Sequence, residues 1–253
     1  MTIPHLAFTP IVGPEGAPLV VLGPSLGTST ILWEDVIPAL AARYRVTAWD
    51  LPGHGASPRA TEPFTVEELA DAVAASVGET FAYAGVSLGG AVGLALALRH
   101  PDRVARAAIV ASGAKLGDPT AWHERAATVR AQSTSSLITA SAGRWFAPGS
   151  IERRPELSGR VLHALQDADD ESYARCCEAL AVYDVREQLP RITAPTLAVW
   201  GESDPVAPEP VAEQIARGVA DGRAVRIDGA AHLPPVEQPD AMAAVLLDFL
   251  GGR

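Results

Sequence analysis

The chain has 253 residues, of which 48% are hydrophobic, and a formal net charge of −10 at pH 7. This size suffices for one large domain, with room for an inserted subdomain. The acidic residues are dispersed along the chain, which argues against nucleic acid and anionic membrane surfaces as partners.

Two strands are predicted in the N-terminal segment. Apolar residues predict these strands over Leu6–Phe8 and Leu19–Leu22, with a turn at Gly13–Gly16 between them. Met1–Phe8 lacks the basic region and the apolar core of a signal peptide. We therefore expect a cytoplasmic protein.

The next part of the chain alternates helix and strand. Apolar residues at helical spacing predict a helix over Trp33–Arg43, and the strand Arg45–Trp49 follows it. This strand ends in the turn-rich loop Asp50–Ser57, where we expect His54 to hydrogen-bond the loop rather than act as a base. Another helix is predicted over Thr65–Val77.

The segment Gly85–Gly89 has the pattern G-x-S-x-G of a nucleophile elbow. It lies between a predicted strand, Thr80–Ala84, and a predicted helix, Gly90–Arg99, which is the setting that this pattern requires. Glycine is needed because a turn this sharp strains the serine and crowds the neighbouring backbone. The pattern predicts Ser87 as a nucleophile and the amide of Leu88 as a donor to a developing oxyanion.

A second oxyanion donor is predicted in the loop that follows the strand Leu19–Leu22. The candidate is the amide of Leu26, which is flanked by the small residues Ser25 and Gly27. An ordinary tight loop is the alternative. Ser25 is also placed among the substrate-contacting residues.

After the elbow helix, the apolar run Val104–Ala111 predicts a strand that is covered on both faces. This run and Gly89–Leu98 are shorter than the ~20 residues of a membrane-spanning helix. Alternating strands and helices predict an α/β fold with a mostly parallel sheet flanked by helices.

The composition changes between residues 115 and 189, where no clear strand is apparent. We interpret this segment as a helical cap, or lid, inserted into a core of residues 1–114 and 190–253. Ligands bind at the carboxyl ends of strands in parallel sheets, and such an insertion would lie across them. Cys176 and Cys177 match neither a disulfide framework nor a metal site and are expected to be buried packing. The helices are predicted over Ala121–Arg130, Ser135–Trp145, Gly159–Ala168 and Ser172–Tyr183.

The last third returns to alternating elements. Strands are predicted over Pro195–Trp200 and Ala224–Ile227, and helices over Pro208–Gly218 and Pro239–Leu250.

Three residues complete a predicted catalytic triad. A serine hydroxyl needs a base, and the base needs an orienting carboxylate. Asp204 and His232 each follow a late strand, so we expect both at the same sheet edge as Ser87, in the chain order serine, acid, histidine. Glu202 is a rival for the acid, but Asp204, followed by Pro205, ends the loop after the strand.

With these residues in place, the chain resembles the α/β-hydrolase family, and within it the 3-oxoadipate enol-lactonases. The resemblance extends over nearly the full length, lid included. It departs at Pro24, where a polar residue is usual in that family. The matching segments are Ser25–Thr28, Asp50–Ser57, Gly85–Gly90, Gly143–Phe146, Tyr173–Cys177, Gly201–Pro205 and Ala231–Leu233.

The resemblance implies a serine hydrolase that opens a carboxylated enol-lactone to 3-oxoadipate, in the β-ketoadipate pathway of aromatic breakdown. It implies an acyl-enzyme intermediate and neither cofactor nor metal. Arg144 would pair with the substrate carboxylate and Trp145 would pack against the lactone ring. The alternatives are an inter-helix or solvated role for Arg144 and a cap-core role for Trp145.

Two other functions stay open at this point. The first is an esterase, lactonase, C–C hydrolase or cofactor-free peroxidase of the same fold, for example in secondary metabolism, because fold does not decide substrate. The second is a ligand-binding protein that keeps the triad without useful turnover. In each case the expected partner is a small molecule, with no nucleic acid and no membrane, and the chain is expected to be a monomer or a homodimer.

Overall fold

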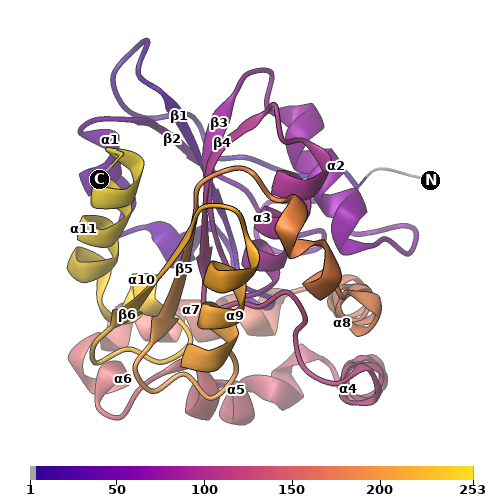
Figure 1. Cartoon of the computed structure of the whole chain (residues 1–253). Helices are drawn as coiled ribbons and strands as arrows, with labels where there is room; N and C mark the ends of the chain where they lie inside the picture. The colour runs from indigo at the N-terminus through magenta and orange to yellow at the C-terminus, as the bar shows by residue number, and fades with distance from the viewer. Residues whose placement is uncertain (1–3, 253) are drawn as a thin grey trace.

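Six strands form a single parallel sheet in the computed structural model, which describes residues 4–252 (Figure 1). The strand order is β2-β1-β3-β4-β5-β6, and each neighbouring pair is parallel. The predicted α/β fold with its parallel sheet is therefore confirmed. The strands are β1 (Leu19–Gly23), β2 (Arg45–Ala48), β3 (Phe81–Val86), β4 (Val104–Val110), β5 (Thr196–Gly201) and β6 (Gly222–Ile227).

Helices cover both faces of this sheet, as parallel strands require. Helices α1 and α11 pack together on one side, and α2 and α3 pack together on the other (Figure 1). Helix α9 packs on β5 and β6. The helical elements outside residues 115–189 are η1 (Thr30–Trp33), α1 (Ile37–Ala41), α2 (Val66–Ser76), α3 (Leu88–Arg99), α9 (Glu209–Gly218), α10 (Pro234–Glu237) and α11 (Pro239–Leu250). The 3₁₀ helix η3 (Arg186–Arg191) spans the end of that segment.

Helix α3 lies deep in the molecule because its sequence is apolar on all sides. Its first ten residues, Leu88–Ala97, are buried, as expected of a helix without a polar face. Gly93 allows the close approach of the sheet, since a Cβ there would lie 2.9 Å from the side chains of Ile109 and Tyr83. The helix that follows the candidate nucleophile is thereby held against β3 and β4.

The predicted strand Leu6–Phe8 is wrong. The segment makes only isolated antiparallel bridges beside β2, between Phe8 and Trp49 and between Val12 and Val46. Pro10 lies between the two bridges and has no amide hydrogen, so it cannot donate to a continuous ladder. Residues 1–3 of the segment Met1–Phe8 lie outside the described residues.

The single predicted helix over Trp33–Arg43 is also wrong, although Trp33, Val36 and Leu40 of its apolar face are buried. The structure has the 3₁₀ helix η1, then a turn, then the five-residue helix α1. Pro38 lies in the first turn of α1. A proline is tolerated there, but it cannot continue a helix that begins at Trp33, because it lacks the amide that would bond backwards.

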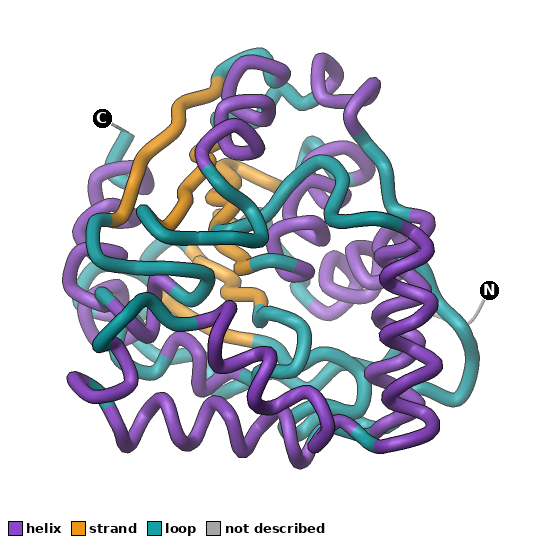
Figure 2. The backbone as a smooth tube through the Cα atoms, turned by 90° about the horizontal axis from the view of Figure 1, so that it is seen from below, coloured by secondary structure: helices purple, strands orange, loops and turns teal. Residues whose placement is uncertain are grey.

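Between β4 and β5 the described chain contains helices and no strand of the sheet. We call residues 115–189 the cap. Its elements lie across the carboxyl ends of the strands, and Figure 2 looks onto this end of the molecule. The cap elements are α4 (Pro119–Gln132), η2 (Thr134–Leu137), α5 (Ile138–Trp145), α6 (Ser150–Arg153), α7 (Pro155–Asp167) and α8 (Asp170–Val182).

Some of these helices differ from the prediction. The predicted helix Ser135–Trp145 is divided into η2 and α5. The short helices α6, η3 and α10 were not predicted.

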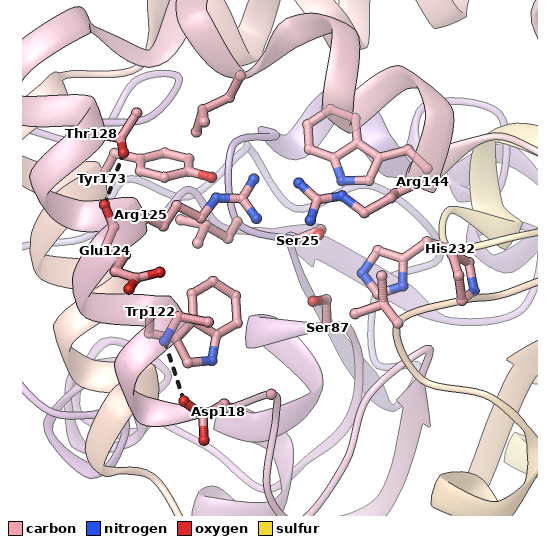
Figure 3. Close-up of a pocket in the computed structure, with 17 residues that line it drawn as sticks. Ser25, Ser87, Asp118, Trp122, Glu124, Arg125, Thr128, Arg144, Tyr173 and His232 are labelled. Carbon is pink, nitrogen blue, oxygen red and sulfur yellow. Dashed lines mark hydrogen bonds between the residues drawn. The ribbon is translucent and has the colours of Figure 1, made fainter.

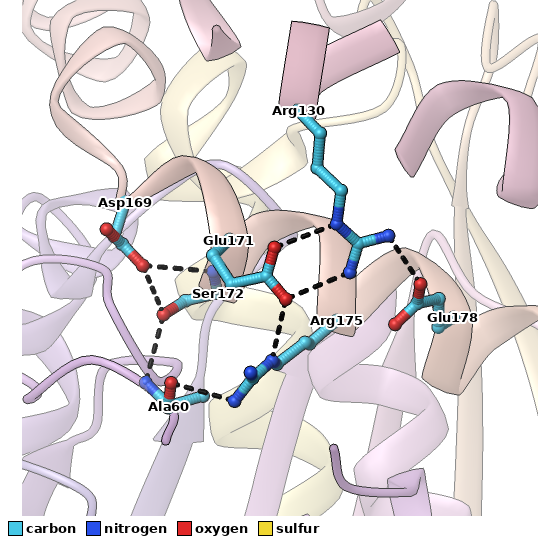
Figure 4. Close-up of polar contacts among 7 residues, drawn as sticks. All are labelled: Ala60, Arg130, Asp169, Glu171, Ser172, Arg175 and Glu178. Carbon is cyan, nitrogen blue, oxygen red and sulfur yellow. Dashed lines mark hydrogen bonds and ion pairs between the residues drawn. The ribbon is translucent and has the colours of Figure 1, made fainter. Parts of the chain in front are cut away.

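Polar contacts join α4 to α8 and join α8 to the core (Figure 4). Arg130 of α4 forms ion pairs with Glu171 at 2.8 Å and Glu178 at 2.6 Å, both on α8. The amide of Ala60, in the core, donates to Ser172 Oγ at 2.9 Å, and its carbonyl accepts from Arg175 at 2.9 Å. The ion pairs are largely exposed and contribute little each, so they orient the cap more than they stabilise it.

Every helix within residues 4–252 is too short or too polar to span a lipid bilayer.

Candidate active site

A cavity of about 530 Å³ lies between the cap and the carboxyl ends of the strands. Its volume is in the range of small-molecule sites. Core and cap both contribute to its wall (Figure 3). The core supplies Ser25, Leu26, Ser87 and His232, and the cap supplies Trp122, Arg125, Arg144, Trp145 and Tyr173.

Ser87 occupies the sharp turn between β3 and α3. Its backbone has φ 54° and ψ −114°, a conformation that is strained for a residue with a side chain. Its amide donates to the carbonyl of Val110 at 2.9 Å, and its carbonyl accepts from Ser112 Oγ at 2.7 Å. These contacts hold the strained turn, and the side chain faces the cavity.

The two glycines of the elbow are required by the neighbouring backbone. A Cβ at position 85 would lie 2.3 Å from the carbonyl oxygen of Gly89. A Cβ at position 89 would lie 2.5 Å from the carbonyl oxygen of Pro24. Neither distance is possible between real atoms, so both positions need glycine, as the G-x-S-x-G pattern predicts.

Asp204 and His232 meet at the carboxyl ends of β5 and β6. His232 Nδ1 lies 3.0 Å and 3.1 Å from the two carboxylate oxygens of Asp204, and both residues are buried. Because a carboxylate accepts, this contact places the proton on Nδ1 and leaves Nε2 free to take a proton from a hydroxyl. The structure therefore joins the predicted acid and base.

The environment of Asp204 keeps its carboxyl group charged. Burial acts to raise the pKa of Asp204, but the hydrogen bond and the charge of His232 together with the amides of Val206 and Ala207 outweigh burial, so the pKa lies below its usual value. The two amides donate to Asp204 Oδ1 at 2.8 Å and 3.2 Å. Glu202, the rival acid, instead accepts from the amide of Gly229 and is exposed.

Ser87 and His232 line the same cavity, but within residues 4–252 no hydrogen bond joins the hydroxyl to the imidazole. Such contacts are often long in the absence of substrate and shorten in the complex. The arrangement is that of a nucleophile, a base and an orienting acid in one wall of a cavity, with the last contact to be closed by bound substrate.

The two predicted oxyanion donors are unpaired. No acceptor within residues 4–252 takes a hydrogen bond from the amide of Leu26 or from that of Leu88. The Leu26 amide lies in a tight turn in which Thr28 donates to the carbonyl of Ser25 at 3.0 Å, with Gly27 at φ 80°. Glycine is favoured at that turn position. A carbonyl oxygen of substrate could accept from both amides at once.

Neighbouring residues hold this oxyanion loop in place. Pro24 departs from the enol-lactonase pattern, yet its carbonyl accepts from the amide of Gly89 at 3.0 Å and so joins the loop to the elbow. His54 Nε2 accepts from the amide of Gly27 at 3.2 Å, while its Nδ1 donates to the carbonyl of Pro52 at 2.9 Å. The prediction that His54 hydrogen-bonds its loop is confirmed.

Glu237, a buried carboxylate beside the candidate base, was not predicted from the sequence. Its Oε2 accepts from the amides of Ala231 and Leu233, on either side of His232, at 2.8 Å and 3.2 Å. Its Oε1 accepts from the amide of Ala147 in the cap at 2.7 Å. The sequence signal that could have indicated Glu237 is a single acidic residue in an otherwise apolar, proline-rich turn.

Cap residues complete the site. Trp145 is buried and lines the cavity, and its carbonyl accepts from the amides of His232 and Leu233 at 3.2 Å and 3.3 Å. Arg144 lines the cavity, and the one hydrogen bond that it forms within residues 4–252 is to the carbonyl of Ala140, on its own helix. Ser25 is buried and faces the cavity. Arg125, Trp122 and Tyr173 also line the cavity, and none of them was predicted as a site residue, although Tyr173 begins one of the segments that carry the family resemblance.

The adjacent cysteines lie away from this cavity wall. Cys176 and Cys177 are both free thiols, buried in α8, and burial raises the pKa of both. They form no disulfide with each other, and their packing role is as expected.

Residues 18–239 match the protein family described as alpha/beta hydrolase fold. The chain is 34% identical to 3-oxoadipate enol-lactonase 2 of Acinetobacter baylyi, a match that covers 90% of this chain and 87% of that protein. It is 32% identical to the pimeloyl-[acyl-carrier protein] methyl ester esterase of Neisseria meningitidis serogroup C, with 94% and 96% covered. The crystal structure of the enol-lactonase from Burkholderia xenovorans LB400 superposes with a TM-score of 0.93, at 33% identity, over 97% of this chain and 96% of that one.

Proposed function

The chain belongs to the α/β-hydrolase fold family, and from this premise we propose that it hydrolyses a carboxylic ester or lactone through a serine acyl-enzyme. The observation that carries this proposal is the pairing of Asp204 with His232 at 3.0 Å in a cavity that also contains Ser87 on its strained turn. The amides of Leu26 and Leu88, which have no acceptor within residues 4–252, supply the place for a developing oxyanion.

In this mechanism Ser87 Oγ attacks the carbonyl carbon, and His232 Nε2 takes the hydroxyl proton. The carbonyl oxygen becomes an oxyanion and accepts hydrogen bonds from the amides of Leu26 and Leu88. Asp204 stabilises the imidazolium that forms. The Asp204–His232 pair is already formed, so once bound substrate closes the contact between Ser87 and His232, little further reorganisation is needed as charge develops.

The intermediate then breaks the bond from the carbonyl carbon to the leaving oxygen, which receives the proton from His232. Water, giving a proton to His232, attacks the acyl-enzyme carbonyl. The bond from the acyl carbon to Ser87 Oγ then breaks, Oγ takes that proton from His232, and the acid is released. For an enol-lactone the leaving group is an enol, which is a better leaving group than an alcohol and becomes a ketone after release. His232 then only needs to assist its departure.

We place the substrate more narrowly as the carboxylated 3-oxoadipate enol-lactone of the β-ketoadipate pathway. Two kinds of evidence support this substrate. Relatives at 34% and 32% identity carry the name 3-oxoadipate enol-lactonase. Arg144 also lines the cavity without any carboxylate partner within residues 4–252, so it is free to pair with a substrate carboxylate.

A methyl esterase of an acyl chain is the second candidate, because several relatives at 30% to 33% identity carry the name pimeloyl-[acyl-carrier protein] methyl ester esterase. The same triad serves both reactions, and only the shape and charge of the cavity discriminate between them.

The test compares turnover of 3-oxoadipate enol-lactone, monomethyl pimelate and para-nitrophenyl butyrate by the purified protein. We expect the highest kcat/KM for the enol-lactone and no turnover by the Ser87→Ala variant. Turnover of the esters but not of the lactone would overturn the substrate assignment. Ser87-independent turnover, or failure of a fluorophosphonate to label Ser87, would overturn the acyl-enzyme mechanism itself.

A further inference from the structure

Two arginines of the cap face each other across the cavity. Arg125 comes from α4 and Arg144 from α5, and Figure 3 shows their guanidinium groups pointing toward one another, on the cap side of Ser25 and Ser87. Like charges that converge on a cavity repel each other unless an anion lies between them. The two positive charges therefore call for a negatively charged partner.

No carboxylate of the described chain neutralises Arg125. Within residues 4–252 its guanidinium forms no ion pair, although Asp118 and Glu124 line the same cavity. Arg130, five residues further along α4, is paired with both Glu171 and Glu178. One arginine of this helix is thus neutralised by the fold, and the other is left facing the cavity.

Two buried polar groups at this wall also lack a partner at hydrogen-bond geometry. They are the Nε atom of Arg125 and the hydroxyl of Tyr173. Burial raises the pKa of Tyr173, and the charge of nearby Arg125 only partly opposes this, so the hydroxyl keeps its proton. Buried donors are nearly always satisfied in folded proteins, so unpaired ones at a cavity wall mark the place of an absent acceptor.

Aromatic rings hold the Arg125 guanidinium from its sides. Its central carbon lies 5.8 Å from the ring of Trp122 and 5.7 Å from that of Tyr173. These rings position the cation without satisfying its hydrogen bonds. The cation is therefore oriented before any anion arrives.

Arg144 shows the effect of this environment. Burial, and after it the charge of Arg125, lower the pKa of Arg144. A bound anion would reverse the second effect and offset the first. Among the described residues Arg144 makes one hydrogen bond, at 3.2 Å to a carbonyl of its own helix, and its other donors remain available.

We propose that Arg125 and Arg144, with the Tyr173 hydroxyl, form a two-arginine subsite that binds the terminal carboxylate of the acyl substrate. This proposal rests on the proposed function and extends it, because it adds Arg125 and Tyr173 as specificity-determining residues. The substrate class is an ester or lactone whose acyl chain ends in a free carboxylate. With that carboxylate in the cap subsite, the reacting carbonyl reaches toward Ser87 in the core.

The subsite also explains how an acidic protein accepts an anionic substrate. The net charge of −10 repels anions at a distance. Asp118 and Glu124 line the same cavity, but within residues 4–252 neither Arg125 nor Arg144 forms an ion pair, so both guanidinium groups can attract a carboxylate at close range, where low dielectric strengthens the attraction. A neutral ester of the same length gains nothing from this field and leaves both arginines unpaired.

The test uses two esters of equal length, para-nitrophenyl hydrogen adipate, which is anionic, and methyl para-nitrophenyl adipate, which is neutral. We expect Arg125→Gln to lower kcat/KM for the anionic ester roughly 10- to 100-fold, mainly through KM, and to change the neutral ester less than about 3-fold. Arg125→Lys should recover part of the loss, because it keeps the charge but not the planar donor pair.

Three further variants complete the kinetic design. Arg130→Gln is the matched control, since it removes an arginine of the same helix that does not line the cavity, and it should leave the anionic-to-neutral ratio unchanged. Arg144→Gln should resemble Arg125→Gln. If both arginines hold one carboxylate, the double variant should lose less than the product of the two single losses. Equal losses of Arg125→Gln on both esters would overturn the proposal.

Calorimetry separates this proposal from the proposed function. In the Ser87→Ala background, monomethyl adipate should bind, and Arg125→Gln should weaken its binding at least 10-fold, while dimethyl adipate is unaffected. If the wild-type protein hydrolyses neither ester but this binding difference appears, the proposed function fails and the subsite stands. Unchanged binding of monomethyl adipate in Arg125→Gln would overturn the subsite, whatever the activity.

Discussion

The imidazole of His54 accepts a hydrogen bond at Nε2 from the backbone amide of Gly27, at 3.2 Å. Gly27 follows Leu26, whose amide is a candidate oxyanion donor and has no acceptor in the described part of the chain. A histidine that is not expected to react with substrate therefore fixes the loop that would stabilise the reaction. Only the neutral ring can accept this bond, and burial lowers the pKa of His54 to about 4, which keeps it neutral at ordinary pH.

This relationship predicts a pH dependence of stability. Since the pKa of His54 falls from 6.5 to about 4 on folding, the unfolded chain binds more protons between these values. The contribution of His54 is complete above pH 6.5 and is lost as the pH falls toward 4, by roughly 3 kcal/mol in total. Urea unfolding of His54→Gln across this range should show a smaller loss than the wild type. Parallel curves for the two proteins would contradict the assignment.

His54 substitutions should also change catalysis. Glutamine offers a neutral oxygen that can accept from Gly27, so His54→Gln should keep kcat within about 10-fold of the wild type. His54→Ala leaves the Gly27 amide unpaired and should lower kcat by about 10- to 100-fold, a part of the cost of losing an oxyanion donor. Steady-state kinetics on para-nitrophenyl butyrate distinguish the two, and equal effects would argue for packing alone.

Glu237→Ala should destabilise the protein strongly. The substitution leaves the buried amides of Ala231 and Ala147 without an acceptor, while the amide of Leu233 keeps the carbonyl of Trp145 at 3.3 Å. We expect a loss of about 2–5 kcal/mol in the free energy of unfolding, together with a lower kcat as the His232 loop loosens. Ser150→Ala is the control, because Ser150 makes one hydrogen bond to Glu237 and should cost about 0.5–1.5 kcal/mol. Urea titration measures both, and a Glu237→Ala effect no larger than this control would contradict the bracing role.

Asp204→Asn should lower kcat by about 10⁴-fold while leaving the fold intact, because an amide favours the wrong tautomer of His232. Glu202→Gln is the control, since Glu202 accepts from Gly229 and not from His232. Its kcat should stay within about 3-fold of the wild type, as for surface changes remote from the reacting groups. The rate of fluorophosphonate labelling at Ser87 provides a second measurement that is independent of substrate choice. A larger loss of kcat in Glu202→Gln than in Asp204→Asn would make Glu202, and not Asp204, the orienting acid.

Gly27→Ala should cost about 1–3 kcal/mol of stability and reduce activity. Gly27 has φ 80°, and a Cβ there would lie 2.6 Å from Leu165 Cδ1 of the cap. Gly159→Ala is the matched control, because Gly159 lies within α7 and a Cβ there would meet open space. That substitution should stabilise the protein by about 0.5–1 kcal/mol through helix propensity. Thermal unfolding measures both variants, and a Gly27→Ala protein as stable as the wild type would contradict the strain assigned to this turn.

Local patterns sufficed for the order of strands and helices and for the strained turn at Ser87. A strand, a glycine-bounded serine and an apolar helix are adjacent in the chain, so sterics and hydrophobic periodicity act within a few residues. The same reasoning placed Asp204 and His232 at one sheet edge, since residues that follow parallel strands share that edge. It failed at Leu6–Phe8 and over Trp33–Arg43, where prolines broke the ladder and the helix that apolar spacing predicted.

Outside the predicted pair of Asp204 and His232, tertiary packing decided which polar residues meet. Glu237 contacts Ala147 across 90 positions of the chain, and Arg125 faces Arg144 only because α4 and α5 close over the same cavity. Nothing near Arg125 in the sequence separates it from Arg130, yet the fold neutralises one and exposes the other to the cavity. The physical reason is that backbone sterics and periodicity are local properties, whereas the partner of a charge depends on which distant segments the core brings together.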